Sequence, residues 1–257
     1  MKLKQLAAQS YTVREYLKTS SNIRMSMKKI REIGYEAVQL SGLGPVGPEE
    51  LAEILEDSGL YCCVTHEPGD MILKEPEKVI EKLKRLNCPY TAYPHPSRIP
   101  LNTLEEVQNF AARLNRAGRI FHDAGITLAY HNHHLEFRRI GDKTILDIIY
   151  EETNPLYLQG EIDTYWVQYG GGNPEAWCRK LKGRLPLLHL KDYAINAENA
   201  ITFAEVGYGN LDWKAIIRAA EESGCLWFIV EQDECSGDPF DSLRKSYDYI
   251  REKIVCI

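Results

Sequence analysis

Imidazole, carboxylate and ammonium groups stand where several short apolar runs of this sequence end. His66 ends one run, His189 and Lys191 end another, and Glu231 follows the run LWFIV. Such groups beside apolar segments cost free energy unless they are paired, hydrogen-bonded or bound to a metal. A site of imidazole and carboxylate ligands suits a divalent ion such as Mn²⁺, Co²⁺, Mg²⁺ or Zn²⁺. The pattern therefore predicts a divalent-metal site, with ordinary ion pairs and helix caps as the simpler interpretation.

Two further runs end in the same residue types. One carries His131 and His133, and the other carries Glu161 and Asp163. Because side chains alternate along a strand, the two histidines share one face and the two carboxylates share another. We expect these faces to converge if the strands lie next to one another.

Eight apolar runs alternate with stretches of helical period, among them residues 103–123 and 211–223. The runs cover residues 4–9, 35–41, 60–66, 89–94, 126–133, 156–163, 185–191 and 226–232. Strands separated by amphipathic helices imply parallel pairing through right-handed crossovers. The α/β pattern predicts a (β/α)₈ TIM barrel forming a single domain over residues 1–257. An open doubly wound sheet is the alternative, although no GxGxxG motif follows the first run.

In a parallel barrel the functional groups lie at the carboxyl ends of the strands. Trp166 follows the strand that ends at Asp163, and it is interpreted either as a wall for a sugar ring or as a core residue. Gly207 and Gly209 form either a phosphate-binding loop or a plain turn. Asn210 is predicted to cap the helix that follows them.

Composition restricts the partners of the protein. Hydrophobic residues make up 44% of the chain, and the formal charge of -6 comes without a basic block, which disfavours a nucleic-acid partner. Seven cysteines without a CxxC pair disfavour a disulfide framework and fit a reduced cytoplasm. The sequence has no apolar run of transmembrane length, so we expect a cytoplasmic protein with no membrane partner. An oligomer is compatible with this composition.

Five segments, in this order and spacing, carry a family resemblance. They read YHNHHLEF, GEIDTYW, LLHLKDY, EVGYGNLDW and IVEQDE. On these segments the chain resembles, over nearly its whole length, the xylose isomerase-like sugar phosphate isomerase/epimerase superfamily. The resemblance implies a TIM barrel that acts on a small-molecule carbohydrate.

The resemblance also implies one divalent metal ion, Mn²⁺ before Co²⁺, Mg²⁺ or Zn²⁺. Asp163, His189 and Glu231 stand at matching positions for three of the family's four ligands. Where many relatives have a glutamate at the end of strand five, this chain has His131, and Glu136 follows five residues later. The resemblance favours Glu136 as the fourth ligand, with His131 as the alternative.

The chemistry that the resemblance implies is abstraction of a proton next to a carbonyl that the metal polarises. Glu231 and Glu136 are expected to act as acid and base, and Lys191 to hydrogen-bond the developing oxyanion. The expected substrate contacts are His66, His131, His133, Glu161 and Trp166. The implied enzyme is an isomerase or epimerase of a sugar or keto-sugar.

Three other functions are weighed against this one. A lyase of the same family would use the same proton abstraction to dehydrate a keto-inositol or to eliminate from a 3-keto-glycoside. DNA-repair endonucleases that share the barrel would need a basic face, which the charge of -6 opposes. A non-catalytic sugar-binding barrel would need no metal.

Overall fold

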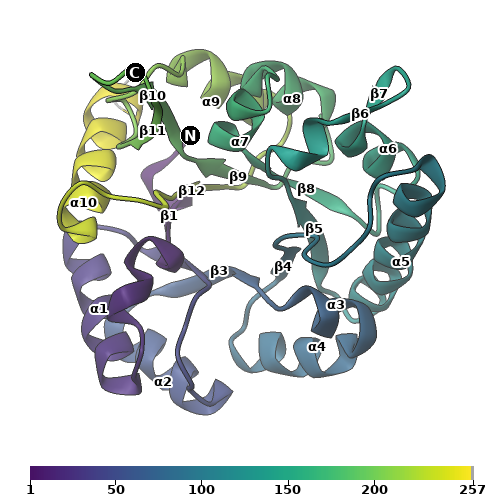
Figure 1. Cartoon of the computed structure of the whole chain (residues 1–257). Coiled ribbons are helices and arrows are strands. Elements are labelled where there is room, and N and C mark those ends of the chain that lie inside the picture. The colour runs from purple at the N-terminus through teal and green to yellow at the C-terminus, as the bar shows by residue number, and fades with distance from the viewer. Residues whose placement is uncertain (256–257) are drawn as a thin grey trace.

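Eight parallel strands close into a barrel at the centre of the molecule (Figure 1). The structure is a computed structural model that describes residues 1–255. The strands are β1 (Leu6–Gln9), β2 (Ala37–Leu40), β3 (Tyr61–His66), β4 (Tyr90–Tyr93), β5 (Thr127–His131), β8 (Gln159–Asp163), β9 (Leu187–Leu190) and β12 (Trp227–Val230). They pair in the order β1-β12-β9-β8-β5-β4-β3-β2, and β2 closes the ring on β1.

Helices surround the barrel and separate consecutive strands (Figure 1). They are α1 (Ser20–Ile33), α2 (Pro48–Ser58), α3 (Gly69–Lys74), α4 (Pro76–Arg85), α5 (Leu104–Asp123), α6 (Ile145–Glu151), α7 (Thr164–Tyr169), α8 (Pro174–Lys180), α9 (Trp213–Glu222) and α10 (Pro239–Tyr249). Three 3₁₀ helices cover Leu3–Gln5, Ser10–Tyr16 and Leu135–Phe137, and a π-helix covers Ile250–Val255. The (β/α)₈ prediction is confirmed, and the doubly wound alternative is wrong.

Side-chain caps set where the helices begin. Thr103 caps α5 and forms a capping box with Glu106, which places the helix where its apolar period predicts it. The prediction that Asn210 caps the next helix is wrong, because Asp212 accepts the Ala215 N–H at 3.1 Å and α9 begins after it. Asn210 instead donates its own N–H to the Tyr193 carbonyl at 2.7 Å.

The inside of the barrel has an apolar layer followed by a polar layer. Small and branched apolar residues form one buried cluster that includes Ala7, Ala37, Ala129, Leu187 and Ile229. Two residues further along the same strands, on the same face, lie Gln9, Gln39, His131, His189 and Glu231. The polar layer therefore lies toward the carboxyl ends of the strands, where the sequence predicts the site.

Two hairpins extend from the loops that follow strands. One pairs β6 (Arg139–Ile140) with β7 (Lys143–Thr144), and the other pairs β10 (Asp192–Ile195) with β11 (Ile201–Ala204). The Asp192 carboxylate, at the base of the second hairpin, accepts the N–H groups of Gly207 and Gly209 at 2.8 and 3.1 Å. These amides are thus occupied within the protein, which corrects the interpretation of the two glycines as a phosphate loop.

Cysteines and apolar segments agree with the sequence predictions within residues 1–255. The six cysteines of this range are free, and Cys256 lies outside the described residues. Across the same residues, every helix is too short or too polar to cross a bilayer.

Candidate metal and substrate site

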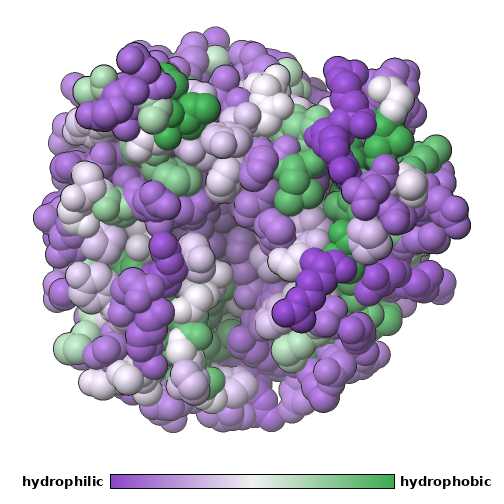
Figure 2. All heavy atoms as spheres, viewed as in Figure 1, coloured by the Kyte–Doolittle hydropathy of each residue, from purple (hydrophilic) through white to green (hydrophobic). Residues whose placement is uncertain are grey.

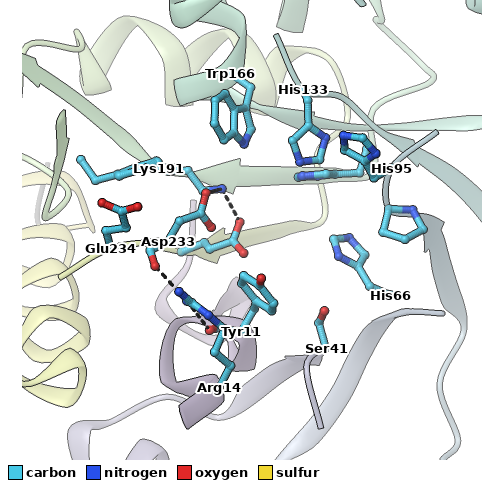
Figure 3. A pocket seen from close by; sticks show the side chains of 14 residues that line it. Tyr11, Arg14, Ser41, His66, His95, His133, Trp166, Lys191, Asp233 and Glu234 are labelled. Atoms are coloured by element: carbon cyan, nitrogen blue, oxygen red, sulfur yellow. Dashed lines mark hydrogen bonds and ion pairs between the residues drawn. The ribbon is translucent and has the colours of Figure 1, made fainter. Parts of the chain in front are cut away.

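A cavity of about 530 Å³ opens at the carboxyl ends of the barrel strands. Figure 2 shows it as a hollow at the centre of this face with hydrophilic side chains around it. His66, His131, His133, Trp166 and Lys191 line it, as the sequence predicts for a site at the mouth. Figure 3 shows how most of these side chains surround one central space.

Four ionisable side chains converge at the cavity. His131, Asp163, His189 and Glu231 each offer one ligand atom, and these atoms all lie within 4.8 Å of one another. They come from β5, β8, β9 and the residue after β12, which are consecutive strands of the barrel. All four side chains are buried. Two imidazoles and two carboxylates at this separation form a donor set that could hold a divalent ion.

Asp163 divides its two oxygens between the fold and this cluster. Its Oδ1 accepts the Trp166 N–H at 3.0 Å and so caps α7. Its Oδ2 is buried and has no hydrogen-bond partner, although Lys191 Nζ lies 3.0 Å away at an unfavourable angle. A buried carboxylate oxygen without a hydrogen bond costs free energy. The residues present therefore fit a bound cation.

The charges around His189 are strongly coupled. Burial alone would lower its pKa, but the carboxylates of Glu161 and Glu231 raise it to about 10. Burial alone would raise the pKa of Glu231, yet Lys191 and His189 hold it well below its usual range. A positive charge is thus favoured between His189 and Glu231, whose Nδ1 and Oε2 atoms are 2.8 Å apart. A proton or a divalent ion at the imidazole can supply that charge.

Lys191 is a buried ammonium group surrounded by carboxylates. Its Nζ lies 2.8 Å from Glu231 Oε2 and 3.1 Å from Asp233 Oδ2. Burial alone would lower its pKa, but Asp163, Glu231 and Asp233 hold the pKa well above the usual range. Lys191 is therefore a hydrogen-bond donor at neutral pH and is unable to act as a base.

Glu161 lies beneath the histidines rather than in the cavity. Its side chain is fully buried, with Oε2 at 2.5 Å from His66 Nε2 and Oε1 accepting the Gln39 amide at 3.0 Å. The same carboxylate is 3.2 Å from His131 Nδ1. This burial corrects the expectation that Glu161 contacts substrate, because protein groups occupy both of its oxygens.

Glu136 points away from the four-residue cluster. The 3₁₀ turn Leu135–Phe137 carries its carboxylate to the Tyr130 hydroxyl and the His133 N–H, at 2.8 and 2.9 Å. Burial raises its pKa to about 7. The preference for Glu136 as fourth ligand and as acid or base is corrected by this geometry, which brings His131 to the cluster instead.

Two buried polar atoms at the cavity have no protein partner, His133 Nδ1 and Trp166 Nε1. Burial and the neighbouring His131 lower the pKa of His133 well below its usual range, so its ring is neutral. An indole N–H donates only, whereas a neutral imidazole can donate or accept. These atoms are suited to the hydroxyl groups of a polar ligand.

The structure adds Gln39 and Asp233 to the site. Gln39 interrupts the apolar strand AVQL of β2, and this polar residue inside an apolar run is the signal that could have found it. Asp233 lines the cavity, and its carbonyl accepts from Arg14 at 2.8 Å (Figure 3). Burial raises the Asp233 pKa despite the Lys191 charge.

Comparison with known proteins decides the family. A family model described as "Xylose isomerase-like TIM barrel" matches residues 27–253. The chain belongs to this family. The sequence-based resemblance is thereby confirmed.

The relatives of the chain within and around this family differ in reaction. An inosose dehydratase of Geobacillus thermodenitrificans (strain NG80-2) is 29% identical over 172 residues, which cover 60% of the chain and 56% of that relative. The match thus spans little more than half of the curated relative's length. A sugar phosphate isomerase/epimerase of Parabacteroides distasonis superposes with a TM-score of 0.84 at 21% identity, covering 99% of the chain and 96% of its own. An L-ribulose 3-epimerase superposes with a TM-score of 0.74 at 16% identity, covering 98% and 94%. At these identities the structural likenesses concern the fold.

Proposed function

We propose that the protein is a divalent-metal-dependent isomerase or epimerase that moves a proton next to the carbonyl of a sugar or keto-sugar. The observation that carries this proposal is the convergence of His131, Asp163, His189 and Glu231 at the floor of a polar cavity. Family membership supports an enzyme of carbohydrate chemistry. Mn²⁺ is the ion that we propose first, and Co²⁺, Mg²⁺ and Zn²⁺ suit the same donor set.

The ion would be held by His131 Nε2, Asp163 Oδ2, His189 Nδ1 and the Glu231 carboxylate. When bound, it would polarise the substrate carbonyl and stabilise the negative charge that develops on the oxygen. Lys191 lies beside the same carboxylates and is a permanent donor, so it orients the substrate and hydrogen-bonds that oxygen. Trp166 and His133 donate to or accept from hydroxyl groups through their unpartnered nitrogens.

Glu231 and Asp233 have pKa values shifted in opposite directions. Burial acts on both, but Lys191 and His189 keep the pKa of Glu231 low, whereas that of Asp233 is raised. An ionised carboxylate next to a more readily protonated one is the arrangement that general base and general acid catalysis requires. We assign Glu231 as the base and Asp233, on the cavity wall, as the acid that returns the proton.

A lyase is the second candidate, and the identity to the inosose dehydratase favours it. The base would remove the same proton, and an acid would then protonate a departing hydroxyl group on the neighbouring carbon. Asp233 lines the cavity and could protonate that group. The two candidates therefore share every step up to the fate of the carbanion equivalent.

One experiment separates these candidates and tests the proposal. Purified protein, stripped of metal and reloaded with Mn²⁺, is incubated in D₂O with keto-hexoses and with a keto-inositol and followed by ¹H NMR. Isomerisation or epimerisation exchanges the α-proton and conserves mass, whereas dehydration loses water. Absence of any bindable divalent ion, with activity unchanged in Asp163→Ala and Glu231→Ala, would contradict the metal-dependent function.

A further inference from the structure

We infer that Gln39 and Glu161 are positioning residues that fix which ring nitrogen of His189 and of His131 faces the metal cluster. The inference rests on the proposed metal-dependent function. Both residues lie beneath the cluster, and both are fully buried. They act through the histidines, without contact to substrate.

The polarity of one hydrogen-bond chain carries the inference for His189. A carboxylate only accepts, so the Gln39 amide group that lies 3.0 Å from Glu161 Oε1 is the NH₂ group. The amide oxygen of Gln39 then faces His189 Nε2 at 2.7 Å. An acceptor at that distance requires the imidazole proton on Nε2.

The other nitrogen of His189 faces the cluster as a consequence. Nδ1 lies 2.8 Å from Glu231 Oε2 and 3.7 Å from Asp163 Oδ2. A lone pair directed at two carboxylates needs a cation between them. The tautomer that Gln39 selects is therefore the one that a metal ion requires.

Glu161 acts on His131 in the opposite sense. Its Oε2 lies 3.2 Å from His131 Nδ1 and also accepts from His66 Nε2 at 2.5 Å. A proton on Nδ1 leaves the lone pair of His131 on Nε2, which lies 3.9 Å from Asp163 Oδ2. One carboxylate and one amide thus present Nδ1 of one histidine and Nε2 of the other to the same point.

Burial strengthens this arrangement. Gln39, Glu161 and His189 are each 0% exposed, so water does not compete for their hydrogen bonds. Partners that orient metal-bound histidines typically contribute about 10- to 100-fold to metal affinity. We expect an effect of that size here.

The wild-type protein provides the first test. The ¹⁵N-histidine-labelled protein is loaded with Zn²⁺, and long-range ¹H–¹⁵N correlation spectra identify the protonated nitrogen of each ring. The expected result is metal on Nδ1 of His189 and on Nε2 of His131. The reverse assignment at either ring, in protein that binds Zn²⁺ by calorimetry, would overturn the inference alone. A wild-type protein that binds neither Zn²⁺ nor Mn²⁺ would overturn the proposed function as well.

Two variants then separate the two histidines. Gln39→Met is nearly isosteric but cannot accept from His189, so we expect Zn²⁺ affinity to fall about 10- to 100-fold and the His189 Nε2–H signal to change. Glu161→Gln keeps its oxygen toward Gln39 and turns an NH₂ group toward His131. The His131 proton should then move to Nε2, while His189 is unaffected.

Thr91→Val is the matched control. Thr91 belongs to a buried hydroxyl pair with Thr65 elsewhere in the barrel wall, and no printed contact joins either to a histidine ring. The control should bind Zn²⁺ as the wild type does and keep both tautomers. If folded Gln39→Met and Glu161→Gln both bind Zn²⁺ within about threefold of this control, with unchanged tautomers, the positioning role is refuted.

Discussion

The two halves of the barrel differ in the charge of their buried polar strand residues. In β1 to β4 these residues are the uncharged Gln9, Gln39, Thr65 and Thr91. In β5, β8, β9 and β12, and directly after them, they are ionisable and include His131, Glu161, Asp163, His189, Lys191 and Glu231. The difference indicates a division of labour in which one half supplies the reactive groups and the other provides neutral hydrogen-bonding support.

Removing a charge from the reactive half should have the largest effect. Asp163→Asn keeps the oxygen that caps α7, and Glu231→Gln keeps the shape of the side chain. Both variants should lose more than about 100-fold in Mn²⁺ affinity, because each removes a proposed ligand rather than its support. Calorimetric titration and turnover measure this. Wild-type Mn²⁺ affinity in both folded variants would show that the halves do not differ in this way.

Lys191→Met should be the next most damaging change. It leaves Asp163, Glu231 and Asp233 without their ammonium partner, and breaking a buried ion pair of this kind costs about 3 to 5 kcal/mol. Urea unfolding of metal-free protein should register that loss, with Lys191→Arg as the charge-preserving control. Equal unfolding free energies for the wild type and Lys191→Met would contradict the assignment of Lys191 to the reactive half.

Glu136 tests a carboxylate of the reactive half that lies outside the cluster. Its pKa is about 7 against an ordinary value of 4.5, so the folded protein holds the proton more tightly between these pH values. The free energy of unfolding attributable to Glu136 therefore falls as pH rises through this window and is constant above it. Glu136→Gln should remove a pH-dependent difference of roughly 3 kcal/mol, measured by urea unfolding at pH 5 and pH 8. A wild-type-minus-variant difference independent of pH would refute this account.

Thr91→Val should have the smallest effect. It removes one buried hydroxyl pair in the neutral half and leaves the Thr65 hydroxyl without that partner, which costs about 1 to 2 kcal/mol of stability. Mn²⁺ affinity and turnover should match the wild type. A Thr91→Val variant that is as stable as wild type yet loses metal would reverse the proposed roles of the two halves.

The sequence predicts the fold better than it predicts atomic contacts. Apolar period and alternation locate all eight strands, because those patterns record which face each element buries. The predicted run 126–133 extends past the end of β5 at His131, where the chain turns and Asn132 Oδ1 accepts the Asp163 N–H at 3.0 Å. A single strand carries no record of that contact, since its partner is 31 residues away.

The same limit explains the errors at the site. Alternation places Glu161 on the inner face, yet its depth beneath the cavity depends on Gln39, which is 122 residues distant in sequence. Glu136 has the right residue type at a plausible spacing, but a local 3₁₀ turn carries it to Tyr130. Residue type and face are local properties, whereas the pairing of atoms across a barrel is set by closure of the whole ring.

The shared carboxylate of Asp163 makes this protein its own optical gauge. One oxygen holds the backbone of Trp166 at the start of α7, and the other faces the metal cluster, while the Trp166 ring lines the cavity. Loading of the cluster and entry of a ligand should therefore both alter the emission of Trp166. Trp177, Trp213 and Trp227 do not line this cavity and supply a steady background, so occupancy can be followed by fluorescence without any added label.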